Sequence, residues 1–236
     1  MNILNMKKTV LRSFGPLVTV VVICFLMTAP GCKKSDDTYK DYTNTAGTFN
    51  GNALQYLQSQ PGLYDSMLLV INRLGGLADT ITKNNITVFA INNKSFSIAL
   101  ENINQARKDF IPTKPEVSFS TMDSATLDTF FCRYILKDRV SSADIRSLTD
   151  GRLFVSTRYN YNMHLQLQRT NASGFQDGGP SSIIFSDPKN SVFVRNWIRV
   201  PTITMDINTN YASVHLLSSG HDFGFGAEFV TLINSR

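Results

Sequence analysis

Apolar residues recur at helical spacing through the first part of the folded chain. A short helix is predicted over residues 53–57, before the Pro61-Gly62 break. A second helix is predicted over residues 63–74, where apolar side chains recur every three to four positions until Gly75-Gly76. The same spacing restarts over residues 96–103. This part of the chain is therefore predicted to be mainly helical.

Between these helices the pattern changes to a short buried strand and then returns to helix. Residues 86–90, Ile-Thr-Val-Phe-Ala, are apolar and β-branched, which predicts a strand after the Asn84-Asn85 turn. Asp123 or Ser124 is expected to cap a helix whose apolar stripe runs over residues 127–135. Residues 141–144 are typical of the first turn of another short helix.

After Gly151 the hydrophobic period falls to two, which favours strands. Residues 163–168 alternate apolar and polar side chains, as in a half-buried strand, and a glycine-rich loop follows over residues 171–182. Further strands are predicted over residues 183–185, 192–194, 203–207 and 212–217. Helices early and strands late predict a single α+β domain with a mostly antiparallel sheet.

The N-terminus has the pattern of a secretory signal. Lys7, Lys8 and Arg12 precede an apolar run over residues 16–27, which is too short for the ~20 residues of a membrane-spanning helix. The alternative is an anchor helix that stays attached. Because the chain turns abruptly polar after Cys32, we favour a signal peptide over residues 1–31.

The junction Ala29-Pro30-Gly31-Cys32 resembles the lipobox of bacterial lipoproteins. The resemblance implies cleavage before Cys32 and attachment of lipid to its thiol, which would hold the protein on the outer membrane. The acidic pair Asp36-Asp37 resembles the surface-export signal of Bacteroidetes lipoproteins, with the periplasmic face as the alternative location. Residues 32–47 are expected to be a flexible tether.

Charge and cysteine content change once this leader is set aside. Lys7, Lys8 and Arg12 are its only charged residues, so its removal lowers the formal net charge from +5 to +2. The apparent basicity therefore gives no support for a nucleic-acid partner. Cys24 leaves with the leader and Cys32 takes lipid, so Cys132 has no disulfide partner and is expected to be buried and inert.

Two segments of the mature chain resemble the conserved boxes of fasciclin domains. Residues 87–96, Thr-Val-Phe-Ala-Ile-Asn-Asn-Lys-Ser-Phe, resemble the first box, and residues 210–217 resemble the second. Tyr134 lies where the family has a Tyr-His pair. The resemblance assigns structural motif positions to Thr87, Val88, Phe89, Ala90, Asn93, Phe96, Tyr134, Val214, His215 and Leu216.

The fasciclin resemblance implies an α+β fold, a β-sandwich or wedge with several helices packed on it, mainly from the N-terminal half. It covers residues 48–236, with an enlarged middle β region at about 150–205. Three residues differ from the family pattern. Ile91 replaces a proline, and Arg133-Tyr134 replaces the Tyr-His pair.

The sequence offers no motif on which to place catalysis. It contains no glycine-rich phosphate loop, no H-E-x-x-H and no G-x-S-x-G. His215 and His221 are too far apart in sequence to be standard ligands on one strand or helix face. A lone histidine such as His215 is more often a hydrogen-bonded core residue. We therefore expect no enzyme activity, no cofactor and no metal.

The predicted function is that of a cell-surface adhesion or binding protein, as fasciclin domains are by resemblance. A specific form is a carbohydrate-binding accessory of an outer-membrane uptake system, in contact with its transporter. Sugar sites use aromatic faces, and Tyr159, Tyr161 and Phe175 near turns of the β-rich half are the candidate binding residues. The alternative is a protein–protein or structural subunit of an envelope complex that binds no glycan.

Overall fold

A computed structural model describes residues 47–236. The predicted signal peptide, the predicted lipid-attachment residue Cys32 and nearly all of the predicted tether lie outside the described residues. The described residues belong to one compact unit, Tyr42–Arg236. Within residues 47–236 no helix is long and apolar enough to cross a membrane.

Seven strands form one sheet in the order β2-β1-β7-β6-β5-β4-β3. Their bounds are β1 Ile86–Ala90, β2 Ile135–Leu136, β3 Arg152–Val155, β4 Asn162–Arg169, β5 Ser181–Asp187, β6 Ile198–Asn208 and β7 Ala212–Leu217. The pair β1–β7 is parallel, and the other five pairs are antiparallel. This agrees with the mostly antiparallel sheet predicted above.

The two outer strands of this sheet also meet, so the sheet nearly closes on itself. Leu136 at the end of β2 pairs with Ser156, just beyond β3. The amide of Lys137 donates to the Val155 carbonyl at 2.9 Å, and that of Thr157 donates to the Ile135 carbonyl at 2.8 Å. This closure leaves few backbone groups unpaired at the two edges.

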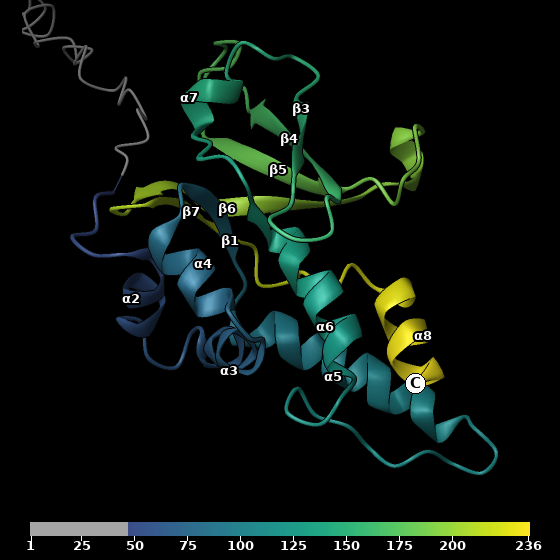
Figure 1. The fold of residues 1–236 in the computed structure, drawn as a ribbon. Coiled ribbons are helices and arrows are strands. Elements are labelled where there is room, and N and C mark those ends of the chain that lie inside the picture. The colour runs from purple at the N-terminus through teal and green to yellow at the C-terminus, as the bar shows by residue number, and fades with distance from the viewer. Residues whose placement is uncertain (1–46) are drawn as a thin grey trace, which may run out of the picture. The chain divides into compact units, whose positions relative to one another are not determined.

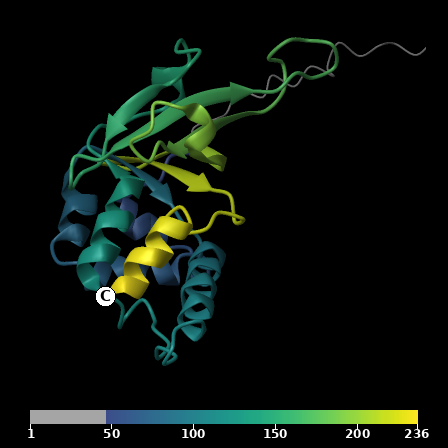
Figure 2. The same ribbon diagram turned by 90° about the vertical axis from the view of Figure 1, so that its right-hand side faces the viewer.

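The helices lie mainly in the N-terminal half. They are α2 Ala53–Gln58, α3 Asp65–Arg73, α4 Leu77–Lys83, α5 Asn93–Lys108, α6 Ser124–Phe131, α7 Ser142–Ile145 and α8 Ala227–Ser235, with 3₁₀ turns η2 Cys132–Tyr134 and η3 Val194–Asn196. Figures 1 and 2 show α5, α6 and α8 together on one side of the sheet, so the last helix returns to pack with the early ones. The predicted α+β class, with helices mainly early in the chain, is confirmed.

Side-chain caps explain where several helices begin. The Asn52 side chain accepts from the Gln55 amide at 2.8 Å, and the Gln55 side chain accepts from the Asn52 amide at 2.9 Å, a capping box that starts α2. Asp123 caps α6 by accepting from the Thr126 amide at 2.8 Å. Local polar residues of this kind fix helix starts.

The start of α5 is fixed by two consecutive asparagines that have different partners. Asn92 is the cap, and its side chain accepts from the Ser95 amide at 3.1 Å. Asn93 is already the first helical residue, and its side chain accepts from the Ser66 amide at 2.8 Å and donates to the Gly62 carbonyl at 3.0 Å. Asn93 therefore ties the start of α5 to α3.

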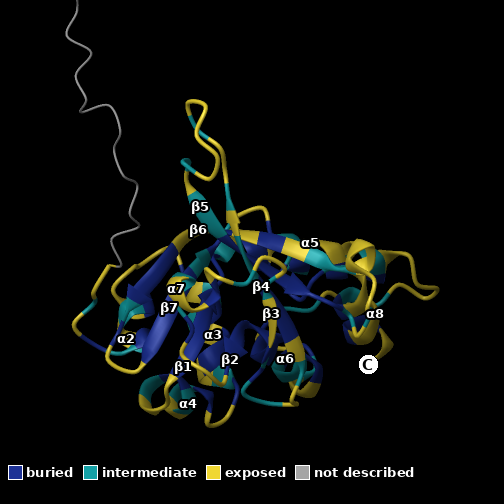
Figure 3. Ribbon diagram, turned by 90° about the horizontal axis from the view of Figure 1, so that it is seen from above, coloured by how far each residue is buried: buried dark blue, intermediate teal, exposed yellow. Residues whose placement is uncertain are grey.

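The core lies between the sheet and the helices and is rich in aromatic rings. All five residues of β1 are buried, and buried residues also line β7, drawn dark blue in Figure 3. The Phe96 ring stacks on Phe223 with centroids 4.6 Å apart, and Phe89 stacks on Phe185 at 4.0 Å. These contacts join α5 and β1 to segments more than 90 residues later in the sequence.

Two predicted segments differ in the structure, and three further elements were not predicted. The predicted strand over 192–194 is an exposed loop that runs into η3. The predicted helix over 127–135 ends at Phe131, because Ile135 pairs with Val88 as part of β2. The pattern also gave no indication of α4, β3 or α8.

Candidate functional site

The two segments that resemble fasciclin boxes are neighbours in the sheet. β1 and β7 pair in parallel, with Val88 opposite Val214, Phe89 opposite His215 and Ala90 opposite Leu216. The side chains of β1 are buried throughout. The residues that carry the resemblance therefore build the centre of the fold.

His215 is a buried core residue in this pairing. Its Nδ1 accepts from the Asp206 amide at 3.1 Å, and its Nε2 donates to the Val140 carbonyl at 3.0 Å. Burial lowers the pKa of His215, so the imidazole is neutral with its proton on Nε2. Both ring nitrogens are occupied, which leaves His215 a structural role.

Tyr134 has a histidine partner from elsewhere in the chain. Its hydroxyl donates to Nε2 of His221 and accepts from the Gly224 amide at 3.0 Å. Burial lowers the pKa of His221 to about 3 and raises that of Tyr134. The neutral pair lies inside the aromatic core and does not reach solvent.

Cys132 is buried, as expected, and carries no signature of a reactive thiol. Its Sγ donates to Oδ1 of Asp128 at 3.2 Å. Burial, followed by the nearby Asp128 carboxylate, raises the pKa of the thiol well above its ordinary value. Such a thiol stays protonated and is a poor nucleophile.

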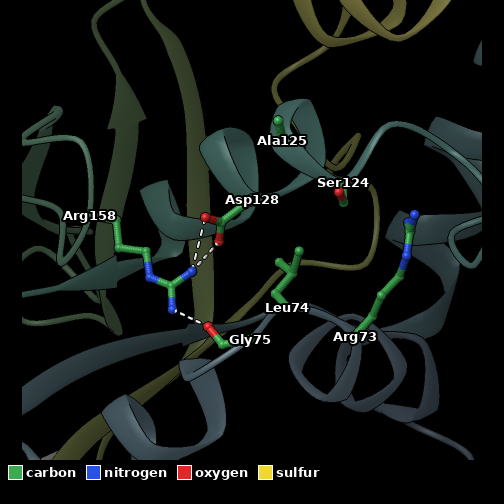
Figure 4. Close-up of a pocket in the computed structure, with 7 residues that line it drawn as sticks. All are labelled: Arg73, Leu74, Gly75, Ser124, Ala125, Asp128 and Arg158. Carbon is green, nitrogen blue, oxygen red and sulfur yellow. Dashed lines mark hydrogen bonds and ion pairs between the residues drawn. The ribbon is translucent and has the colours of Figure 1, made fainter.

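A polar pocket of about 230 Å³ lies beside Asp128 and is the best candidate site. Three segments far apart in sequence meet there, the α3–α4 turn, the first turns of α6 and the β3–β4 turn. Figure 4 shows the lining residues Arg73, Leu74, Gly75, Ser124, Ala125, Asp128 and Arg158. In the part of the chain that the structure describes, no cluster of three or more metal-ligating side chains occurs.

Asp128 organises this pocket. Arg158 Nη1 donates to both carboxylate oxygens of Asp128, at 2.8 and 2.9 Å. Arg158 Nη2 donates to the Gly75 carbonyl at 2.6 Å, so one guanidinium joins all three segments. The opposite wall is fixed by Arg73, whose guanidinium donates to the carbonyls of Phe119 and Met122. Both arginines are held in place before any ligand arrives.

Tyr159 adds an aromatic face next to the same carboxylate. Its hydroxyl donates to Oδ2 of Asp128 at 2.6 Å, and this hydrogen bond raises the pKa of Tyr159. Its backbone is left-handed, with a φ of 64°, and the residue is 55% exposed. A non-glycine residue in this conformation is uncommon, and such residues cluster at functional sites.

The other two predicted binding residues lie elsewhere. Tyr161 is half-buried; its ring covers Arg133 at 4.1 Å, and its hydroxyl donates to Asp187 at 2.6 Å. Phe175 lies in the loop after β4, and the eight residues of that strand span roughly 25 Å. Tyr159, Tyr161 and Phe175 therefore do not form one surface, and Tyr159 lies next to the pocket through its hydrogen bond to Asp128.

Arg158 and Asp128 were not among the residues selected from the sequence. Asp128 is noticeable only as a polar position beside the apolar stripe of α6, and Arg158 follows it 30 residues later. Neither residue belongs to a spaced motif. Their pairing depends on how the β3–β4 turn docks against α6.

Comparison with known proteins gives structural similarity but no match of sequence. No protein-family model matches the sequence, and no match is found among curated proteins. Among solved structures, the chain is similar to a FAS1 domain pair from the insect cell adhesion molecule fasciclin I, with a TM-score of 0.45 and 17% sequence identity. The match covers 74% of this chain and 46% of that one, so the chain spans less than half of the fasciclin I structure.

Proposed function

We propose that this protein is a non-catalytic, fasciclin-like binding module that holds one sugar residue of a glycan in the Asp128–Arg158 pocket. The observation that carries the proposal is the exposed ring of Tyr159, fixed by Asp128 beside a polar pocket with immobilised charged groups. Protein sites for sugars combine an aromatic face, which packs on the C–H face of the sugar, with polar groups that bind its hydroxyls.

The chemistry of the pocket suits a neutral ligand better than an ionic one. Arg158 and Asp128 neutralise each other through an ion pair in which Nη1 donates to both carboxylate oxygens, and the guanidinium of Arg73 is engaged by two carbonyls. Both Asp128 oxygens also accept from Cys132 or Tyr159, so the Ser124 hydroxyl is the group of this wall that can bind a sugar hydroxyl. At about 230 Å³ the pocket is below the usual size for drug-like ligands, which favours a single sugar residue.

The wider setting of this proposal comes from the sequence. With lipid on Cys32, the module would stand on the outer membrane as a cell-surface protein that works beside an outer-membrane transporter. The domain would then capture glycan for that transporter or for adhesion. These parts of the proposal rest on the lipobox and on the acidic pair after it.

The decisive experiment is a glycan array on the unit Tyr42–Arg236, followed by titration of the best glycan against variants. We expect Tyr159→Ala to weaken binding by about tenfold or more, as loss of an aromatic contact does. Tyr211→Ala is the matched control, because Tyr211 is a similarly exposed tyrosine, at 48%, and lies in the β6–β7 turn, which contributes no residue to the pocket lining. Tyr161→Ala and Phe175→Ala test the two other residues selected from the sequence.

Two outcomes would contradict the proposal. One is the absence of binding to any glycan by protein that unfolds cooperatively. The other is binding that Tyr159→Ala leaves unchanged. A stable complex on membrane solubilisation, without glycan binding by the isolated unit, would instead support the alternative of a protein-docking subunit.

A further inference from the structure

The connection between β5 and β6 presents an exposed apolar run. Val192, Phe193 and Val194 are consecutive and are 85%, 58% and 52% exposed. Figure 1 shows this connection, with η3 in light green, extending away from the sheet on the side of α8. Three adjacent exposed apolar side chains are unfavourable in water and mark an interaction site.

The loop is held in this exposed form by its own hydrogen bonds. Ser191 Oγ accepts from the Phe193 amide at 3.1 Å and from the Asn196 side-chain amide at 3.0 Å. The Ser191 carbonyl accepts from the Trp197 indole N–H at 2.8 Å. Ser191 thus connects the start of the loop to Phe193, Asn196 and Trp197. Because these hydrogen bonds hold the apolar tip in one conformation, we expect the tip to lose little conformational entropy when it binds.

The charges that flank this tip all have one sign. Residues 188–199 contain Lys189, Arg195 and Arg199 and no acidic residue. The preceding Asp187 is fully buried against Arg133, at 2.6 Å, and does not offset them at the surface. An apolar tip with cations around it is complementary to a surface that is apolar inside and anionic outside.

Trp197 lies at the base of the loop, where such a surface would end. It is half-buried, and its ring packs against His164 of β4 with centroids 4.7 Å apart. Tryptophan is the residue that favours the boundary between lipid and water, because its ring is apolar and its N–H is polar. Along the chain from the tip, the apolar run is followed by Arg195, then by Trp197, and then by Arg199 at the start of β6.

A second exposed apolar tip on the same protein lacks this arrangement. Ile111 is fully exposed next to Phe110, in the loop after α5. That loop carries acidic residues as well as basic ones, with Lys108 near Glu116 at 4.0 Å. Both loops therefore expose apolar side chains. Of the two, residues 188–199 form the loop whose charged residues all have the same sign.

We propose that residues 188–199 form a membrane-contacting loop, which inserts Val192, Phe193 and Val194 into the interface of an anionic bilayer. Lys189, Arg195 and Arg199 then lie at the level of the headgroup phosphates. This contact is separate from the Asp128–Arg158 pocket. It also needs no lipid on Cys32 and orients the domain on the membrane it touches.

The test uses the unit Tyr42–Arg236, which lacks Cys32 and so carries no lipid of its own. Trp197 is the only tryptophan in the chain, so its fluorescence reports on this loop alone. We expect a blue shift and co-sedimentation with phosphatidylcholine vesicles that contain phosphatidylglycerol. Pure phosphatidylcholine vesicles should bind markedly less, and high salt should weaken the binding.

Three variants sharpen this test. The triple change V192S/F193S/V194S should lower partitioning by at least about tenfold. The change K189Q/R195Q should lower it by about fivefold per cation, and only on anionic vesicles. I111S removes an equally exposed apolar side chain elsewhere and should leave partitioning unchanged.

The proposal is overturned if the Trp197 emission does not shift with anionic vesicles, or if the triple variant binds them as the parent does. It is also overturned if the parent forms a dimer in analytical ultracentrifugation that the triple change dissociates, because the tip would then be covered by a second copy.

Discussion

The hydroxyl of Tyr134 donates a hydrogen bond to Nε2 of His221, which follows it by 87 residues. The fasciclin resemblance places a Tyr-His pair near this position, and this sequence has Arg133-Tyr134 there instead. The fold therefore supplies an imidazole beside Tyr134 from the C-terminal segment. The contact fastens the segment that leads into α8 to the turn that leads into β2.

This contact predicts a stability loss for Tyr134→Phe. The change leaves the ring in place but removes the hydrogen-bond partner of His221 Nε2 and of the Gly224 amide, which are both buried. We expect the free energy of unfolding to fall by about 1–3 kcal/mol, the cost of unsatisfied buried polar groups. Urea denaturation measures it. Tyr211→Phe removes the hydroxyl of an exposed tyrosine and should change stability little; equal losses in the two variants would refute this role.

The same histidine predicts that the protein becomes less stable in mild acid. Burial lowers the pKa of His221 to about 3 in the folded protein, against an ordinary value near 6.5. Between these values the unfolded chain binds a proton that the folded chain does not. The stabilisation is therefore complete above pH 6.5 and is lost as the pH falls, at about 1.4 kcal/mol per pH unit for one such group.

Other groups also modify this pH dependence. Burial lowers the pKa of His164 and of His215, which adds to the loss in acid, while burial raises the pKa of Asp222, which opposes it at lower pH. Urea denaturation between pH 7 and pH 5 measures the slope, and His221→Gln should reduce it. NMR titration of the ring of His221 should show no protonation in the folded state over this range; a midpoint near 6.5 would contradict the prediction.

The part of the fold that the sequence predicts is the part with local signals. β1 is a β-branched apolar run beside an asparagine turn, and Asp123, one of the two residues expected to cap α6, is its cap. The predicted helix runs past the end of α6 because Ile135 is apolar and buried, and such a residue fits a helix as well as a strand. Ile135 belongs to a strand because it pairs with Val88, and hydrophobic periodicity does not reveal that pairing.

The candidate site is less accessible to sequence reasoning because it is made of long-range pairs. Tyr159 was selected as an aromatic residue near a turn, and its partner Asp128 was not, since no spacing connects them. The run Val192-Phe193-Val194 shows the converse error. It has the composition of a strand, yet no neighbouring strand pairs with it, and Ser191 holds it as an exposed loop.

The buried ion pair between Arg133 and Asp187 yields a further prediction. Nη1 of Arg133 lies 2.6 Å from Asp187 Oδ2, and the two side chains are 5% and 0% exposed. The guanidinium also packs on the ring of Phe130, at 4.0 Å from its centroid. Asp187→Asn would leave the buried guanidinium with only the partly exposed Glu228, 3.6 Å from Nη2, as its counter-charge. We therefore expect a loss of about 3–5 kcal/mol in the free energy of unfolding.

A matched control for this change exists on the surface. Asp79 pairs with Lys83 at 2.8 Å, with side chains 72% and 71% exposed. Asp79→Asn makes the same chemical change and should cost no more than about 1 kcal/mol. Adding Arg133→Met to Asp187→Asn should recover part of the loss, because it removes the unpaired charge. A double variant as unstable as the sum of the two single variants would argue against the ion pair.

Gly151 provides the last prediction, because it positions the turn that carries Arg158. Its φ is 72°, and a Cβ added there would lie 2.1 Å from the Leu165 carbonyl oxygen on β4. Gly62 also has a positive φ, 81°, but a Cβ there would meet nothing within 4 Å. Gly62→Ala should therefore cost about 1 kcal/mol from backbone strain alone. Gly151→Ala should cost about 3 kcal/mol or more, since β3 must also move away from β4.

Because that movement shifts the β3–β4 turn, Gly151→Ala should also weaken ligand binding at the Arg158–Asp128 pocket, whereas Gly62→Ala should not. Thermal unfolding and glycan titration of the two variants measure both effects, and equal stability losses would show that the close approach of Gly151 to β4 has no energetic role.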